Sequence, residues 1–159
     1  MAWSAENKLE WVHFKANSKP GADIAALTAS GITFSFSVEE SSERGYLSFD
    51  TTVEAHFYPE KSWYIKERAN EHILAHEQLH FDLTELHVRK LRYQISKLKI
   101  SSNIKKELNA IHGRVNLELA EMQNLYDFET DHSRNIEKQN NWSAFVENEL
   151  IKFKEFASK

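Results

Sequence analysis

The chain has 159 residues, of which 41% are hydrophobic and 12% aromatic, and this length and composition fit one domain with a substantial core. Its net charge of −4 comes from interspersed acidic and basic residues, and no apolar run approaches the roughly 20 residues that span a bilayer, so neither nucleic acid nor a transmembrane segment is expected. Without cysteine, disulfides and thiolate chemistry are excluded, and any metal must be held by nitrogen and oxygen atoms.

The first 64 residues are predicted to be rich in strands. In ITFSFSV, residues 32–38, apolar and small polar residues alternate with the period of a half-buried strand. The run GYLSFDTTVEAHFYP, residues 45–59, is rich in β-branched and aromatic residues and ends at a proline. We expect these runs to form an antiparallel hairpin or meander, with LEWVHF, residues 9–14, as a further candidate strand.

Residues 65–159 are predicted to be helical, because they contain no proline and one glycine and their apolar residues recur at helical spacing. We expect one long helix over residues 66–99, a second that begins after Ser102 or Asn103 as N-cap, and a third after Asp131. No internal repeat or linker separates the two parts, so the chain is expected to form a single α+β domain over residues 1–159.

The segment HEQLH, residues 76–80, matches the pattern H-E-x-x-H. Residues four apart lie one turn apart on one helix face, so His76 and His80 would reach the same ion. Zinc suits neutral imidazoles, and Glu77 is the candidate general base that acts on the water at the metal. The apolar residues around the segment favour this interpretation over a chance match on the surface, because burying these polar groups is costly unless they are bonded or ligated.

A catalytic zinc site typically has three protein ligands and an open position for water. The other histidines of the same helix lie too far along it to share the ion, so the third ligand is expected from another element. His132, in the polar and aromatic run YDFETDHSRNIEKQNNW, is one candidate, and His56 and Glu129 remain open as alternatives.

Several residues are candidates for supporting roles in such a site. Tyr126 and His87 are candidate donors to the oxyanion of a reaction intermediate. Either strand of the expected hairpin could pair with an extended peptide beside the cleft. The candidate groups that would fix the ligand histidines in one tautomer are the carboxylates of Asp82, Glu85, Glu129 and Asp131.

Five segments that together extend over most of the chain resemble a bacterial family of predicted secreted zinc-dependent proteases: LEWVHFK, AALTASGI, KSW, LAHEQLHFD and YDFETDHSRNIEKQNNW. The resemblance implies a zincin-like fold, in which N-terminal antiparallel strands pack on the long H-E-x-x-H helix and two further long helices follow. It implies His76, His80 and His132 as zinc ligands, Glu77 as general base, and export to a secreted or periplasmic location. In that family the later histidine is usually followed by glycine, whereas Ser133 follows here.

The sequence therefore predicts an α+β, zincin-like zinc hydrolase, and specifically a metallopeptidase that acts on a peptide or protein substrate. The alternative is a non-catalytic envelope protein that keeps a structural or vestigial zinc site and binds a partner. A third interpretation is a helical interaction module that binds no metal.

Overall fold

A computed structural model describes residues 1–19 and 21–159 of the chain. Over these residues the chain forms two antiparallel strand pairs and three long helices, so the α+β class is confirmed. None of the helices it describes is both long enough and apolar enough to cross a bilayer. In chain order the elements are β1 (Ala26–Leu27), β2 (Ser30–Ser41), β3 (Gly45–Phe57), β4 (Trp63–Tyr64), α1 (Glu71–Ser96), α2 (Ile104–Thr130) and α3 (Ile136–Lys152), with 3₁₀ helices at Trp11–His13, Pro59–Lys61, Lys66–Arg68 and Lys154–Phe156.

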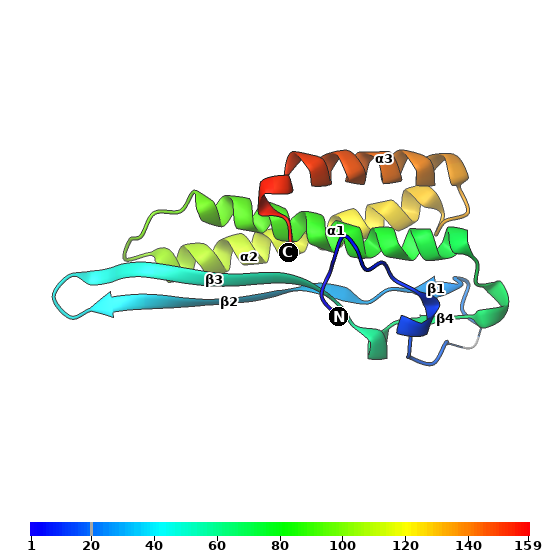
Figure 1. Cartoon of the computed structure of the whole chain (residues 1–159), viewed down its shortest axis with the longest axis horizontal. Coiled ribbons are helices and arrows are strands. Elements are labelled where there is room, and N and C mark those ends of the chain that lie inside the picture. The colour runs from blue at the N-terminus through cyan, green and yellow to red at the C-terminus, as the bar shows by residue number, and fades with distance from the viewer. Residues whose placement is uncertain (20) are drawn as a thin grey trace.

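Strands β2 and β3 form the predicted hairpin, with Phe34 opposite Val53. Figure 1 shows it running along the helices, with its turn extending past the connection between α1 and α2. Gly45 at the turn has a φ of 73°, a left-handed conformation that glycine adopts without a Cβ clash. The alternating apolar residues of β2 pack against the core, as the period of two predicted: Ile32, Phe34, Phe36 and Val38.

The prediction of a further strand at residues 9–14 is wrong. Trp11–His13 forms a 3₁₀ turn, and the Trp11 ring stacks on Tyr64 with the ring centroids 4.7 Å apart. Aromatic packing therefore holds this segment in place of a ladder of backbone hydrogen bonds. The edge of β3 is paired by residues near the N-terminus instead, where Ala2 forms a bridge with His56.

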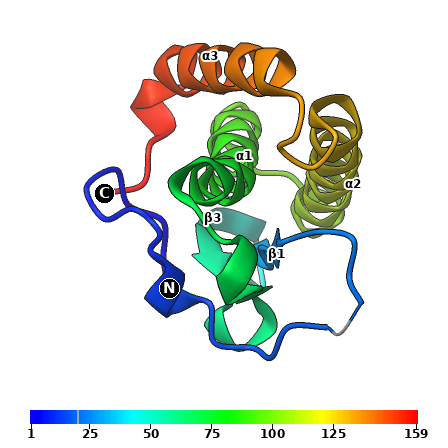
Figure 2. The same cartoon turned by 90° about the vertical axis from the view of Figure 1, so that its right-hand side faces the viewer.

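Helix α1 is the central element and contacts the hairpin, α2 and α3. Viewed along its axis, α2 lies beside it, α3 lies across the two helices, and the hairpin lies on the opposite side (Figure 2). The helix begins at Glu71, later than predicted, because the side chain of Asn70 accepts a hydrogen bond from the Ile73 N–H and caps it. The second helix begins after Asn103, as predicted.

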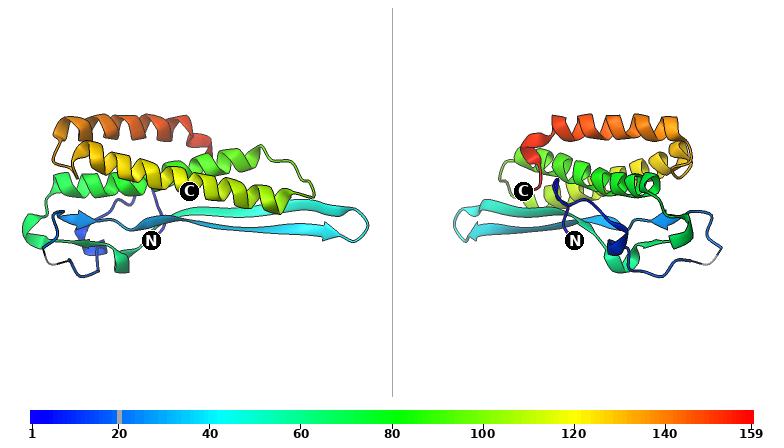
Figure 3. Two further views of the ribbon diagram at one scale, coloured as in Figure 1. Left: turned by 180° about the vertical axis from the view of Figure 1, so that it is seen from behind. Right: turned by 45° about the vertical axis from the view of Figure 1, so that its right-hand side comes forward.

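Three consecutive residues with positive φ connect α2 to α3: Asp131 at 49°, His132 at 52° and Ser133 at 85°. For residues other than glycine this conformation costs about 1 kcal/mol or more each, and it persists only where the surrounding structure holds it. The Asn135 N–H donates to the Thr130 carbonyl across the turn. The chain reverses here, so that α3 runs back along α1 and α2 (Figure 3).

Candidate metal centre

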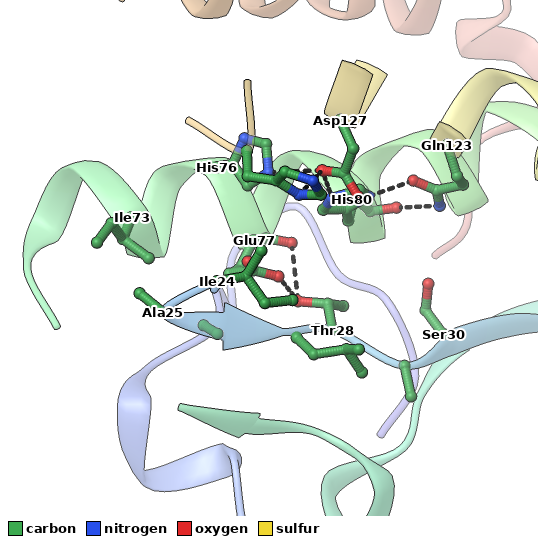
Figure 4. Close-up of a pocket in the computed structure, with 14 residues that line it drawn as sticks. Ile24, Ala25, Thr28, Ser30, Ile73, His76, Glu77, His80, Gln123 and Asp127 are labelled. Atoms are coloured by element: carbon green, nitrogen blue, oxygen red, sulfur yellow. Dashed lines mark hydrogen bonds and ion pairs between the residues drawn. The ribbon is translucent and has the colours of Figure 1, made fainter. Parts of the chain in front are cut away.

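His76 and His80 lie one turn apart on the buried face of α1, and Asp127 of α2 lies opposite both (Figure 4). Nε2 of His76 is 2.9 Å and Nε2 of His80 is 2.8 Å from the same carboxylate oxygen, Oδ1 of Asp127. Both imidazoles are buried, whereas the Asp127 side chain is 31% exposed. The three candidate ligand atoms all lie within 4.8 Å of one another, which makes this group a candidate metal site.

Two glutamine side chains orient the imidazoles by contacting Nδ1 of each ring, whereas Asp127 lies at Nε2. Oε1 of Gln139, on α3, is 2.7 Å from Nδ1 of His76, and Oε1 of Gln123, on α2, contacts Nδ1 of His80. The amide nitrogen of Gln123 donates to the His80 carbonyl, and that of Gln139 donates to the hydroxyl of Tyr126, which itself donates to the His76 carbonyl. Each amide therefore turns its oxygen toward an imidazole, and each imidazole carries its proton on Nδ1.

This choice of tautomer leaves an unprotonated Nε2 on each neutral imidazole, aimed at an ionised carboxylate. Three hydrogen-bond acceptors thus converge on one point with no hydrogen atom between them, which is unfavourable unless a cation lies there. The cation is either a proton on the imidazoles or a metal ion. Two imidazole nitrogens and one carboxylate oxygen are a ligand set that suits zinc.

The pKa directions show the same preference for positive charge. Burial alone would raise the pKa of the Asp127 carboxyl, but hydrogen bonds from His76 and His80 in their protonated form outweigh it and hold that pKa well below its usual range. Burial alone would lower the pKa of His80, but the hydrogen bond to Asp127 and the charge of Glu77 outweigh it and raise that pKa. The carboxylate stays ionised, and its field favours a cation beside it.

Glu77 lies next to this group and lines the same pocket. The hydroxyl of Thr28 donates to Oε2 of Glu77 at 2.5 Å, from the chain segment that faces α1 (Figure 4). Among the described residues no donor bonds to the other carboxylate oxygen, Oε1. The side chain is therefore held through one oxygen, and the other faces the pocket without a partner among the described residues.

The pocket has a volume of about 260 Å³ and lies between α1, α2 and residues 24–30. Within this segment β1 pairs with β4, and the Ile65 N–H donates to the Ala25 carbonyl. Because hydrogen-bonded positions alternate along an antiparallel pair, the N–H and C=O of Ala26 point away from β4. The strand segments that line the pocket are β1 and the start of β2. The sequence had suggested the longer stretches of the hairpin for this position.

His132 lies at the rim of the pocket, outside the group of three. Its Nδ1 is 3.7 Å from Oδ1 of Asp127, and its side chain is 41% exposed. Its role as third ligand stays a prediction. The two alternatives lie elsewhere, since His56 contacts Thr33 on the hairpin and Glu129 lines a separate groove beside α3.

The groups that fix the tautomers differ from those expected. The described residues place two amides on the ligand imidazoles, and the candidate carboxylates make other contacts: Asp82 accepts from Trp3, and Glu85 pairs with Arg89. Asp127 and Gln123 were missed as site residues. Their spacing of four on a predicted helix places them on one face, and this spacing was the available signal.

The two residues expected to stabilise an oxyanion are buried structural residues. The hydroxyl of Tyr126 bonds to the His76 carbonyl and to Gln139, and burial raises the pKa of this phenol. His87 bonds to the Leu83 carbonyl one turn earlier on α1. Neither lines the pocket.

An α+β domain with two histidines and an aspartate converging beside a glutamate defines a candidate metal-binding protein. The chain belongs to the family described as bacterial protein of unknown function (DUF922), whose model matches residues 15–133. No curated protein and no solved structure matches the chain. The matched range includes the hairpin, α1, α2 and every candidate site residue: His76, Glu77, His80, Asp127 and His132.

Proposed function

We propose that this protein is a zinc-dependent hydrolase that cleaves peptide bonds, and that His76, His80 and Asp127 hold the zinc. The observation that carries the proposal is the convergence of three acceptor atoms whose protonation is fixed by two glutamine amides. Asp127 takes the place that the family resemblance gives to His132.

A catalytic rather than a structural site is favoured by the number of ligands and by the pocket. Structural zinc sites are closed by four protein ligands, whereas catalytic sites keep one position for water. Here three ligand atoms converge, and the same residues line a pocket into which the carboxylate of Glu77 also faces. The zincin-like architecture implied by the resemblance is part of this proposal.

In the mechanism, a bound zinc would supply a water whose pKa lies near neutrality. Glu77 accepts the proton of the attacking water through the oxygen that Thr28 leaves unbonded. As the bond between the water oxygen and the carbonyl carbon forms, the carboxylate becomes a carboxylic acid. When the C–N bond breaks, Glu77 returns the proton to the departing amine and is again ionised.

The edge of β1 supports an extended peptide as the substrate. The main-chain groups of Ala26 face away from β4, on a strand that borders the pocket. A peptide added antiparallel to this edge would satisfy these groups without reading its side chains. Such a docking places a backbone amide, the bond to be cleaved, close to Glu77.

Zinc content tests the metal site. Elemental analysis of protein purified without chelator or metal-affinity tag should find about one zinc per chain, lost in His76→Ala and in Asp127→Ala. The matched control is His112→Ala, since His112 lies on α2 outside the pocket and contacts Asn116. Wild-type protein that takes up no zinc, even when zinc is added back, contradicts the proposal.

Glu77→Gln tests catalysis separately, with hydrolysis of a quenched-fluorescent peptide mixture as the readout. The variant should keep its zinc and lose at least about a hundredfold in rate, because the amide accepts no proton. An unchanged rate would remove Glu77 from the mechanism. Zinc-loaded wild-type protein without any hydrolysis would favour the non-catalytic zinc protein instead.

A further inference from the structure

His132 faces the pocket but does not belong to the group of residues that can share one ion. Nitrogen and oxygen atoms bound to one zinc at about 2.0–2.1 Å lie at most about 4.2 Å apart. The group whose ligand atoms all lie within 4.8 Å of one another contains His76, His80 and Asp127, and His132 is not part of it. In this arrangement His132 is not part of the ligand group, and its imidazole is free for another role.

The backbone around His132 is held firmly in a costly conformation. The residue is the middle one of three with positive φ. Its N–H donates to the carbonyl of Asp127, and the carbonyl of Ser133 accepts a hydrogen bond at 2.6 Å from Nε2 of His72 on α1. The loop is thus tied to both helices that carry the candidate ligands, α1 and α2. These bonds fix the position of His132 relative to His76, His80 and Asp127.

The imidazole of His132 is left without a partner by this arrangement. Its separation of 3.7 Å from the Asp127 carboxylate is too long for a hydrogen bond, and the described residues offer it no other acceptor within bonding distance. The ring is partly exposed and lines the same pocket as Glu77. An N–H of the ring is therefore available to a molecule bound there.

We propose that His132 is a catalytic residue that donates a hydrogen bond to the carbonyl oxygen of the peptide bond under attack; this role rests on the proposed function. When the water oxygen bonds to the carbonyl carbon, Glu77 takes the water proton and the electron pair of the C=O bond moves to the carbonyl oxygen. The N–H of His132 stabilises the resulting negative charge. When that pair re-forms the C=O bond, the C–N bond breaks, the amine takes the proton from Glu77, and His132 keeps its own proton throughout.

The test compares His132→Ala, which removes the donor, with His132→Asn, which keeps an N–H donor and tolerates the left-handed backbone. His112→Ala is the matched control. The readouts are zinc content, the affinity of the zinc-loaded protein for inorganic phosphate measured by calorimetry, and kcat and KM with a peptide substrate. Phosphate serves as a tetrahedral anion that resembles the intermediate.

For His132→Ala we expect full zinc content, phosphate affinity reduced about tenfold or more, and kcat reduced about 10²–10³-fold with little change in KM. His132→Asn should recover part of both losses. Loss of zinc in His132→Ala, as in His76→Ala, would show that the residue is a ligand and overturn the proposal. Full zinc with unchanged phosphate affinity and kcat would overturn it while leaving the proposed function intact, whereas wild-type protein without zinc would overturn both.

Discussion

Helix α1 carries two buried polar clusters that differ in the balance of their hydrogen-bond donors and acceptors. Around Glu85, one carboxylate oxygen accepts from Arg89 and from the Ser158 N–H, and the other accepts from the Ser158 hydroxyl. Two turns earlier, His76 and His80 meet Asp127 with acceptors only. Burial alone therefore does not distinguish the two clusters. The two clusters differ in that the second holds acceptors that only a cation would satisfy, which is why it is the candidate metal site.

The largest effect is expected from breaking the first cluster, formed by Glu85, Arg89 and Ser158 and here called the balanced cluster. Glu85→Ala leaves the buried guanidinium of Arg89 without its carboxylate, and should lower the free energy of unfolding by about 3–5 kcal/mol. Chemical denaturation of the purified variant measures it. Glu149→Ala is the control, since its 3.9 Å contact with Lys90 is a partly exposed pair worth about 1 kcal/mol or less. Equal losses in the two variants would contradict the assignment of Glu85 as a structural anchor.

His87 sharpens the comparison, because it is a third buried polar group on α1 and has its own acceptor. Burial lowers the pKa of His87 to about 4, below the 6.5 of the unfolded chain. Between these two values the imidazole is protonated in the unfolded state and neutral in the folded state. Its contribution to stability is therefore complete above pH 6.5 and is lost as the pH falls toward 4. The total loss is about 3 kcal/mol.

Denaturation series between pH 4 and pH 7 check this prediction on the wild type and on His87→Met. The variant should lose the part of the pH dependence that His87 causes, so the difference between the two proteins should shrink or change sign toward low pH. Parallel curves for the two proteins would show that His87 does not titrate in this range.

Zinc should raise the free energy of unfolding by binding at the second cluster, formed by His76, His80 and Asp127 and here called the unbalanced cluster. At a free zinc concentration about a hundred times the Kd, binding to the folded state alone adds about 2.7 kcal/mol to the free energy of unfolding. Thermal denaturation with zinc, and again after a chelator is added, measures the gain and its reversal. Glu77→Gln should gain as much as the wild type, whereas an equal gain in Asp127→Ala would mean that zinc binds elsewhere.

The smallest effect concerns the loop beside the unbalanced cluster. Ser133 has a φ of 85°, in the region where glycine is favoured, and glycine is the residue that usually follows the histidine in the resembling family. Ser133→Gly relieves the local strain but gives the unfolded chain more freedom, so the net gain should be about 1 kcal/mol or less. Denaturation midpoints measure the gain, and a clear loss of stability would show that the serine side chain has a role of its own.

Periodicity predicted the hairpin and the three helices, because long elements repeat their pattern many times. It did not predict β1 and β4, since strands of two residues carry no period and exist through their pairing. The segment at residues 9–14 was misassigned because aromatic packing, rather than a backbone ladder, positions it. The later start of α1 reflects the cap at Asn70, a local signal that outweighed the helical pattern before it.

The candidate site was predictable where its residues are close in sequence. His76, Glu77 and His80 belong to one short motif on one helix. Asp127 and the two glutamines reach the motif only through the packing of α2 and α3 on α1, and an amide gives no sign in sequence that it will fix a histidine tautomer. Export from the cell is implied by the resemblance alone and stays a prediction.

Tyr126 lies flat against His76, with ring centroids 4.5 Å apart and 24° between the planes, and meets His80 edge-on at 4.8 Å. The Tyr126 ring packs between α1 and α2 and so helps to set the distance between the two helices. The candidate ligand atoms are therefore spaced in the absence of an ion. A small ion that takes nitrogen and oxygen at about 2.0–2.2 Å matches that spacing, whereas calcium requires six to eight oxygen atoms at about 2.3–2.6 Å. The spacing of the candidate ligand atoms therefore rests on a buried phenol ring that lies outside the pocket.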